Sequence, residues 1–184
     1  RFGSEPDLAV VSFRIVDPLS GSTMRHHIPR VGKRSLMDSG DVTSFLGGAC
    51  AIRAEAFHSV GGFPDFFFYG LEETDLAWRL IDAGWRVSYD ADLIVHHAQS
   101  CERGCRFSTQ LAVRNRVLVA RRRIPAVLAL FYVAVWSAIT VFRARRLGFL
   151  LKGIKEGLGI CVERKPMQWS TVWKLAKLGR PPII

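Results

Sequence analysis

The stretch EETDLAWRLIDAGWRVSY, residues 72–89, decides the fold class. It opens with acidic residues, which favour the first turn of a helix, and apolar residues follow at helical spacing. Gly84 stands where such a helix would end, and the residues after it have the composition of a strand. A helix that leads through a glycine into a strand indicates an α/β domain.

The flanking sequence extends this pattern in both directions. Residues 8–16 and 92–96 are predicted to be further strands, and residues 53–60 a short helix that stops at a pair of glycines. From about residue 108 the pattern is helical to the end. The sequence therefore predicts an α/β part over residues 1–107 and a helical tail over residues 108–184.

Charge separates the same two parts. The chain has 184 residues and a net charge of +10. Residues 1–100 carry 9 Lys/Arg against 13 Asp/Glu, whereas residues 101–184 carry 17 against 3. With 49% hydrophobic residues and four cysteines, the composition excludes a disordered chain and a disulfide-stapled module.

The basic tail contains an uncharged apolar run of 19 residues, 124–142, with arginines on both sides. This arrangement indicates an anionic membrane surface more than nucleic acid, and no RNA-binding or zinc-finger signature is present. We expect a helix lying in or on the cytoplasmic face of the plasma membrane, because a single span would place the basic C-terminal segment outside. A buried helix and a true span remain as alternatives.

Two clusters carry chemistry. Glu72-Glu73-Thr74-Asp75 places three carboxylates at a helix start, where mutual repulsion raises the proton affinity of at least one and favours a general base. Alternatively, these acids only cap the helix. His96-His97 follows an apolar strand, at the kind of sheet edge where ligands bind, although histidines there are often structural.

Several segments in fixed order resemble the second half of a family 2 glycosyltransferase, which has the GT-A fold. They are GGACAIR (47–53), VGGF (60–63), FFYGLEETDLAWRL (67–80), AGWRV (83–87) and His97. Arg114-Asn115-Arg116 also resembles a segment found just after the catalytic domain in bacterial members. The resemblance covers roughly residues 8–123. Glu73 departs from it, since the family usually has aspartate at that position.

The resemblance implies roles for individual residues. Glu73 takes the position of the catalytic base and Glu72 that of its acidic neighbour, while His97 takes that of a metal ligand for Mn²⁺ or Mg²⁺. Substrate contacts are expected at Gly48, Ala49, Asp75 and Trp78.

The implied activity is the transfer of a sugar from a nucleotide-sugar donor to a saccharide or lipid-linked acceptor, with inversion, in cell-envelope synthesis. No Asp-x-Asp motif or nucleotide-binding half precedes residue 8, so we expect the chain to be the acceptor-side half of the domain. The alternative is a truncated or degenerate module that binds a membrane or a partner without catalysis.

Overall fold

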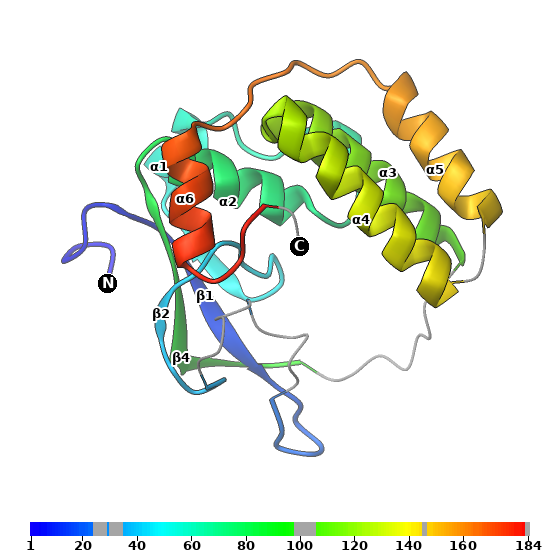
Figure 1. Cartoon of the computed structure of the whole chain (residues 1–184). Coiled ribbons are helices and arrows are strands. Elements are labelled where there is room, and N and C mark those ends of the chain that lie inside the picture. The colour runs from blue at the N-terminus through cyan, green and yellow to red at the C-terminus, as the bar shows by residue number, and fades with distance from the viewer. Residues whose placement is uncertain (24–28, 30–34, 98–105, 145–146, 183–184) are drawn as a thin grey trace.

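The computed structural model describes residues 1–23, 29, 35–97, 106–144 and 147–182, with their side chains except those of residues 106–108 and 143–144. A mixed sheet and the helices beside it form the fold (Figure 1). The strands are β1 (Leu8–Val16), β2 (Gly40–Asp41), β3 (Cys50–Ile52) and β4 (Arg86–His96). The helices are α1 (Ala54–Ser59), the 3-10 helix η2 (Asp65–Phe67), α2 (Glu72–Asp82), α3 (Arg106–Arg123), α4 (Ala126–Ala144), α5 (Leu147–Gly159) and α6 (Trp169–Lys177).

The sheet has the strand order β2-β4-β1-β3. Its central strands β1 and β4 are parallel, whereas β3 and β2 run antiparallel to their neighbours at the two edges. The inner strands are the most apolar, and Leu8, Val10 and Val87 are at most 1% exposed. The predicted α/β class is therefore confirmed.

Helix α2 and the strand after it follow the predicted pattern, with one correction. Gly84 has φ 95°, and this left-handed conformation ends α2 and turns the chain into β4. The sequence predicts two strands here, over 85–89 and 92–96, but β4 is a single strand. It pairs with β1 on both sides of an irregularity, where Phe13 is opposite Asp90 and Arg14 is opposite Ile94. The intervening residues of β4 bulge out of the ladder without ending it.

The helices after residue 106 pack against the α/β part and against one another. Helix α3 contacts α2, α4 and α5, and α6 contacts α2 (Figure 1). Leu118 and Val119 of α3 and Leu175 of α6 are fully buried in the same core as the apolar residues between positions 76 and 81 of α2. The boundary predicted at residues 107 and 108 falls within the first turn of α3.

The apolar run forms α4, which has two different faces. Tyr132 is 5% exposed and lies against the core, as do Leu128 and Trp136 in part. On the other face Leu130 is 77% exposed and Phe131 is 56% exposed. Among the helices that the structure describes, none is long and apolar enough to cross a membrane.

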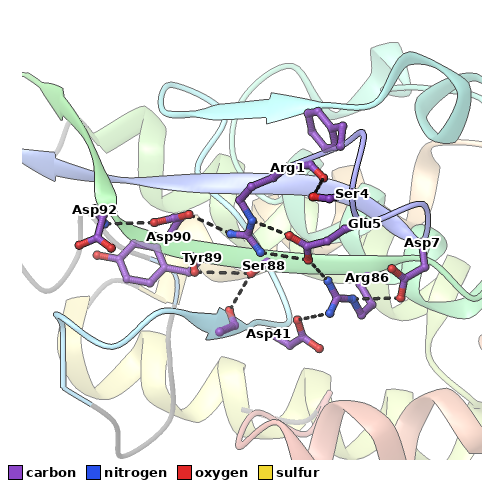
Figure 2. Close-up of polar contacts among 12 residues, drawn as sticks. Arg1, Ser4, Glu5, Asp7, Asp41, Arg86, Ser88, Tyr89, Asp90 and Asp92 are labelled. Atoms are coloured by element: carbon purple, nitrogen blue, oxygen red, sulfur yellow. Dashed lines mark hydrogen bonds and ion pairs between the residues drawn. The ribbon is translucent and has the colours of Figure 1, made fainter.

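A polar network ties the N-terminal segment to the sheet (Figure 2). Arg1 donates to Glu5 at 2.7 Å and to Asp90 of β4 at 2.9 Å, and the guanidinium of Arg86 also binds Glu5 and reaches Asp7 at 3.1 Å. Partly exposed ion pairs contribute little singly, but this network links residues before β1 to Arg86 and Asp90 in the first half of β4.

Candidate active site

A pocket lies at the N-terminal end of α2, between that helix and two loops that lead to it. Its volume is about 470 Å³. One loop precedes β3, and the other runs from the end of α1 through η2. The lining residues are Gly47, Gly48, Phe63, Pro64, Asp65, Phe67, Phe68, Glu72 and Glu73. We call this the acidic pocket. It brings together three residues that the sequence singled out, namely Gly48, Glu72 and Glu73.

The carboxylate of Glu73 is half-buried in the acidic pocket. Burial raises the pKa of Glu73, and the negative charge of Glu72 raises it further. Backbone N–H groups of Glu73 itself and of Gly47 oppose this effect, and the Gly47 N–H donates to Oε1 of Glu73 at 3.3 Å. A carboxylate with a raised proton affinity beside an open pocket has the properties of a general base.

Gly47 permits a close approach to this carboxylate. A Cβ atom at position 47 would lie 2.8 Å from Oε1 of Glu73, closer than side-chain atoms normally come. At Gly48 a Cβ would meet no atom within 4 Å. The position of Glu73 therefore requires glycine at residue 47, whereas residue 48 has room for a side chain.

The thiol of Cys50, on the neighbouring strand β3, is also affected by the charge of Glu73. Its thiol lies 3.6 Å from the carbonyl oxygen of Gly47. Burial first, and then the charge of Glu73, raise the pKa of Cys50 to about 11. The thiol is therefore protonated at neutral pH and is a poor nucleophile.

Glu72, the other member of the acid pair, also lines the pocket. Its Oε2 is buried and has no hydrogen-bond partner within the described part of the chain. Buried carboxylate oxygens are nearly always hydrogen-bonded, so this unpaired oxygen is an exception at the wall of the pocket.

Aromatic side chains form the opposite rim of the acidic pocket. Phe68 is 78% exposed and Phe63 is 40% exposed, whereas Phe67 between them is fully buried. Exposed aromatic rings beside polar groups are typical of binding sites, because they give an apolar surface on which a ligand can rest. The sequence indicated an aromatic loop here but assigned it no function.

Asp75 lies in the interior, outside the lining of the acidic pocket. It is 0% exposed, and its carboxylate accepts from Arg79 at 2.8 Å and from Arg123 at 2.9 Å, with Arg122 at 3.7 Å. These partners join α2 to the end of α3. Trp78 is 5% exposed within the hydrophobic core. Each side chain points into the interior and neither lines the acidic pocket, so the substrate contacts expected at these two residues stay predictions.

Ala49 is also buried, at 2% exposure, although it adjoins the pocket residue Gly48. Its carbonyl oxygen accepts from the N–H of Phe13 at 2.8 Å and so belongs to the sheet. The structure thus gives Ala49 a place in the backbone ladder, and its side chain is outside the pocket lining.

His97 follows β4 and is exposed, and its N–H donates to the carbonyl of Val16 at the end of β1. It is not among the residues that line the acidic pocket. Within the described residues, no group of three or more His, Cys, Asp and Glu side chains is placed to hold a metal ion. The cation that the resemblance implies therefore has no ligand set there. Cys101 and Cys105 lie outside the described residues.

Comparisons with known proteins match this chain to glycosyltransferases. Residues 33–99 match a family described as the N-terminal domain of galactosyltransferase. The chain is 32% identical over 101 residues to the pre-mycofactocin glycosyltransferase of Mycobacterium tuberculosis, which covers 50% of this chain and 21% of that protein. It is 40% identical over 62 residues to the N-acetylglucosaminyl-diphospho-decaprenol L-rhamnosyltransferase of the same organism, covering 32% of this chain and 20% of that protein.

These matches confirm the resemblance to bacterial glycosyltransferases, and the mixed α/β fold is consistent with a GT-A-like domain. The chain spans about a fifth of the length of the curated relatives that it matches. The matched family model covers the acidic pocket, from Gly47 to Glu73, together with β4.

Proposed function

We propose that this chain supplies the acceptor side of an inverting glycosyltransferase, in which Glu73 is the general base. The observation that carries the proposal is the half-buried Glu73 carboxylate, which lines an open pocket and has a pKa raised by burial. The relatives, whose names describe them as glycosyltransferases, support sugar transfer as the reaction class.

The proposed chemistry follows from where the carboxylate lies. An acceptor hydroxyl in the acidic pocket gives its proton to Glu73 as its oxygen bonds to the anomeric carbon of the donor sugar. The bond from that carbon to the diphosphate oxygen breaks, and the nucleoside diphosphate leaves from the opposite face with inversion. The transition state resembles an oxocarbenium ion, as in glycoside hydrolysis.

The acceptor is proposed to be a saccharide, either free or lipid-linked, in cell-envelope synthesis. Phe63 and Phe68 support this choice, since they give a sugar ring an apolar surface beside the acid pair. The name of the rhamnosyltransferase relative describes a sugar carried on diphospho-decaprenol, which is a lipid-linked acceptor.

The test is a transfer assay on the full-length protein with a panel of nucleotide-sugars and acceptors. Glu73→Gln removes the proton acceptor and should lower turnover by about 10²–10⁴-fold while donor binding is kept. In the wild type, kcat/KM should fall with decreasing pH, and the fall should begin above the range of an ordinary glutamate because the pKa of Glu73 is raised. Near-normal turnover of Glu73→Gln would contradict the assignment.

A divalent cation, Mn²⁺ or Mg²⁺, remains part of the proposal and would neutralise charge on the leaving diphosphate. His97 is the residue proposed to bind it. His97→Ala should shift the Mn²⁺ dependence of activity more than His96→Ala does, and the reverse order would transfer the role to His96.

We also propose that the helical part contacts an anionic membrane surface, on the cytoplasmic side. The supporting observation is a continuous exposed apolar face on α4, which includes Val127, Leu130, Phe131 and Phe142. The neighbouring helix α5 exposes Leu147, Leu151 and Leu158 together with Lys152 and Lys155. Apolar residues with interspersed lysines match the pattern of helices that lie in a lipid interface.

Vesicle co-sedimentation tests this contact. The protein should bind vesicles containing phosphatidylglycerol and bind phosphatidylcholine vesicles poorly, since each basic residue near an anionic surface contributes about 1 kcal/mol. Leu130→Glu on α4 should weaken binding, whereas Leu19→Glu, at a site 91% exposed in the turn after β1, should not. Equal loss in both variants would contradict the proposed surface. Membrane binding with no sugar transfer would instead favour the non-catalytic module.

A further inference from the structure

The loop that leads into the acid pair has an unusual backbone. Phe68 has φ 62° and ψ −59°, and the N–H of Tyr69 donates to the carbonyl of Phe67 at 2.8 Å. Together these describe a γ-turn of the rare positive-φ kind. Leu71, immediately before α2, has φ 71°. Such conformations are strained for residues other than glycine and persist only where the surroundings enforce them.

Two adjacent side chains of α3 enforce this loop. Asn115 is fully buried, and its Nδ2 donates to the carbonyls of Phe67, Tyr69 and Gly70 at 3.1, 2.9 and 2.6 Å. Arg114 donates through Nη2 to the carbonyls of Phe66 and Phe67 at 3.0 and 2.6 Å. Its Nε also donates to Oδ1 of Asn115 at 3.0 Å, which fixes the orientation of the amide.

The strain at Phe68 is not offset by packing of its own side chain, whereas Leu71 packs against the hydrophobic core. Phe68 is 78% exposed and Tyr69 is 70% exposed, so the turn places two aromatic rings at the surface instead of in the core. Phe68 lines the acidic pocket, and Glu72 and Glu73 follow two residues after Gly70. A strained turn that exposes aromatic side chains beside a carboxylate pair indicates a functional constraint more than a structural one.

We propose that Asn115, oriented by Arg114, is a positioning residue for sugar transfer. It holds the loop 66–71 so that the Phe68 ring borders the acidic pocket and the acid pair begins α2 at the pocket wall. The inference rests on the proposed function. It extends that function to a residue of α3, outside the pocket lining, and makes the helical part of the chain necessary to the geometry of the site.

The experiment compares variants on one helix. Asn115→Leu keeps the number and branching of the side-chain heavy atoms but removes every N–H donor, and Arg114→Met removes the two bonds to the loop. Arg116→Met is the matched control, because the Arg116 guanidinium stacks on Trp136 at 4.0 Å instead of bonding to the loop. The measurements on full-length protein are kcat, donor KM, the pH profile and amide hydrogen exchange of residues 66–71.

Both loop variants should lower kcat, by about 10²-fold for Asn115→Leu, while donor KM changes little. The acid limb of the pH profile should move to lower pH, because a loosened loop lets water reach Glu73 and so weakens the effect of burial on its pKa. The titratable groups beside Glu73 are the carboxylate of Glu72, which also raises its pKa, and the neutral thiol of Cys50 on β3. Exchange at residues 66–71 should accelerate. Arg116→Met should leave all of these unchanged, whatever it does to the melting temperature.

The outcomes separate the two proposals. If Asn115→Leu does not fold, Arg114→Met carries the test. Wild-type kcat and wild-type exchange in a folded loop variant would overturn the positioning role, even with Glu73→Gln inactive. If the wild type transfers no sugar, the proposed function fails. Amide hydrogen exchange then tests only whether Asn115 holds the loop. Faster exchange of residues 66–71 in the loop variants would support this role, and unchanged exchange would overturn it.

Discussion

Gly47 is the residue on which the position of the Glu73 carboxylate depends most directly. In Gly47→Ala the new methyl group would meet Oε1 at 2.8 Å, so the carboxylate must move and its bond from the residue 47 N–H must lengthen. We expect kcat to fall by about 10-fold or more, because small displacements of a base are costly. Gly48→Ala adds a methyl group in open space and should have the smaller effect. Equal activities in a transfer assay would contradict this.

The sequence singled out the acids but not their neighbours. The start of a helix was enough to identify Glu72 and Glu73 as an acid pair, whereas their closeness to Gly47 appears only in the structure. The ion pair of Asp75 was not predicted, because its partner Arg123 lies 48 positions away and no local pattern reveals such a pairing. Asn115 was visible only as part of a resemblance, since its role depends on three carbonyls that carry no sequence signal.

Helix α5 is held against α3 through glycines. A Cβ at Gly153 would lie 2.7 Å from the carbonyl oxygen of Gln110, and one at Gly157 would lie 2.7 Å from Cβ of Val117. Gly157→Ala should therefore force the helices apart and lower the free energy of unfolding by about 1–3 kcal/mol. Gly148→Ala on the same helix meets no atom within 4 Å and should be neutral or stabilising. Urea denaturation of the two variants measures the difference, and equal stabilities would exclude the close approach.

Elements with a strong internal pattern were predicted almost to the residue. Strand β1 matches residues 8–16, and α2 ends one residue before the predicted Ala83. Strand β4 was divided in two because residues between Asp90 and Ile94 interrupt its alternation. Both halves pair with β1, and this is seen only in the strand register. A register depends on two segments, so the sequence of β4 alone could not predict it.

Asp75 joins the α/β part to the helices that follow it. Its buried carboxylate binds Arg79 of its own helix and Arg123 of α3, and Asp75→Asn would leave these guanidiniums without a counter-charge. We expect the free energy of unfolding to fall by about 3–5 kcal/mol. Asp92→Asn, at an exposed position of β4, is the control and should change stability little. A loss below about 1 kcal/mol in Asp75→Asn would show that the arginines have other compensation.

The relation between the two parts of the chain could not be predicted from composition. The acidic first half and the basic second half of the sequence indicated two functions. This difference in net charge is summed over many residues and does not show which of them are in contact. Contact between the parts depends instead on a few buried side chains, including Asn115 and Leu118 of α3 and Leu175 of α6. Whether residues 108–184 form a separate domain stays a prediction, whereas their packing against α2 is a feature of the fold.

The bonds from Asn115 to the loop before α2 join positions 45 to 48 residues apart, and they limit how such genes can exchange segments. A recombination crossover between residues 72 and 106 would join the loop of one parent to the α3 of another. The hybrid would then have the loop and acid pair of one parent and the α3 of the other. Unless both parents have the Asn115 side chain and the same backbone turn, α3 would not form the hydrogen bonds that hold the loop. Exchange of substrate preference between relatives should therefore involve segments that include both the loop and α3.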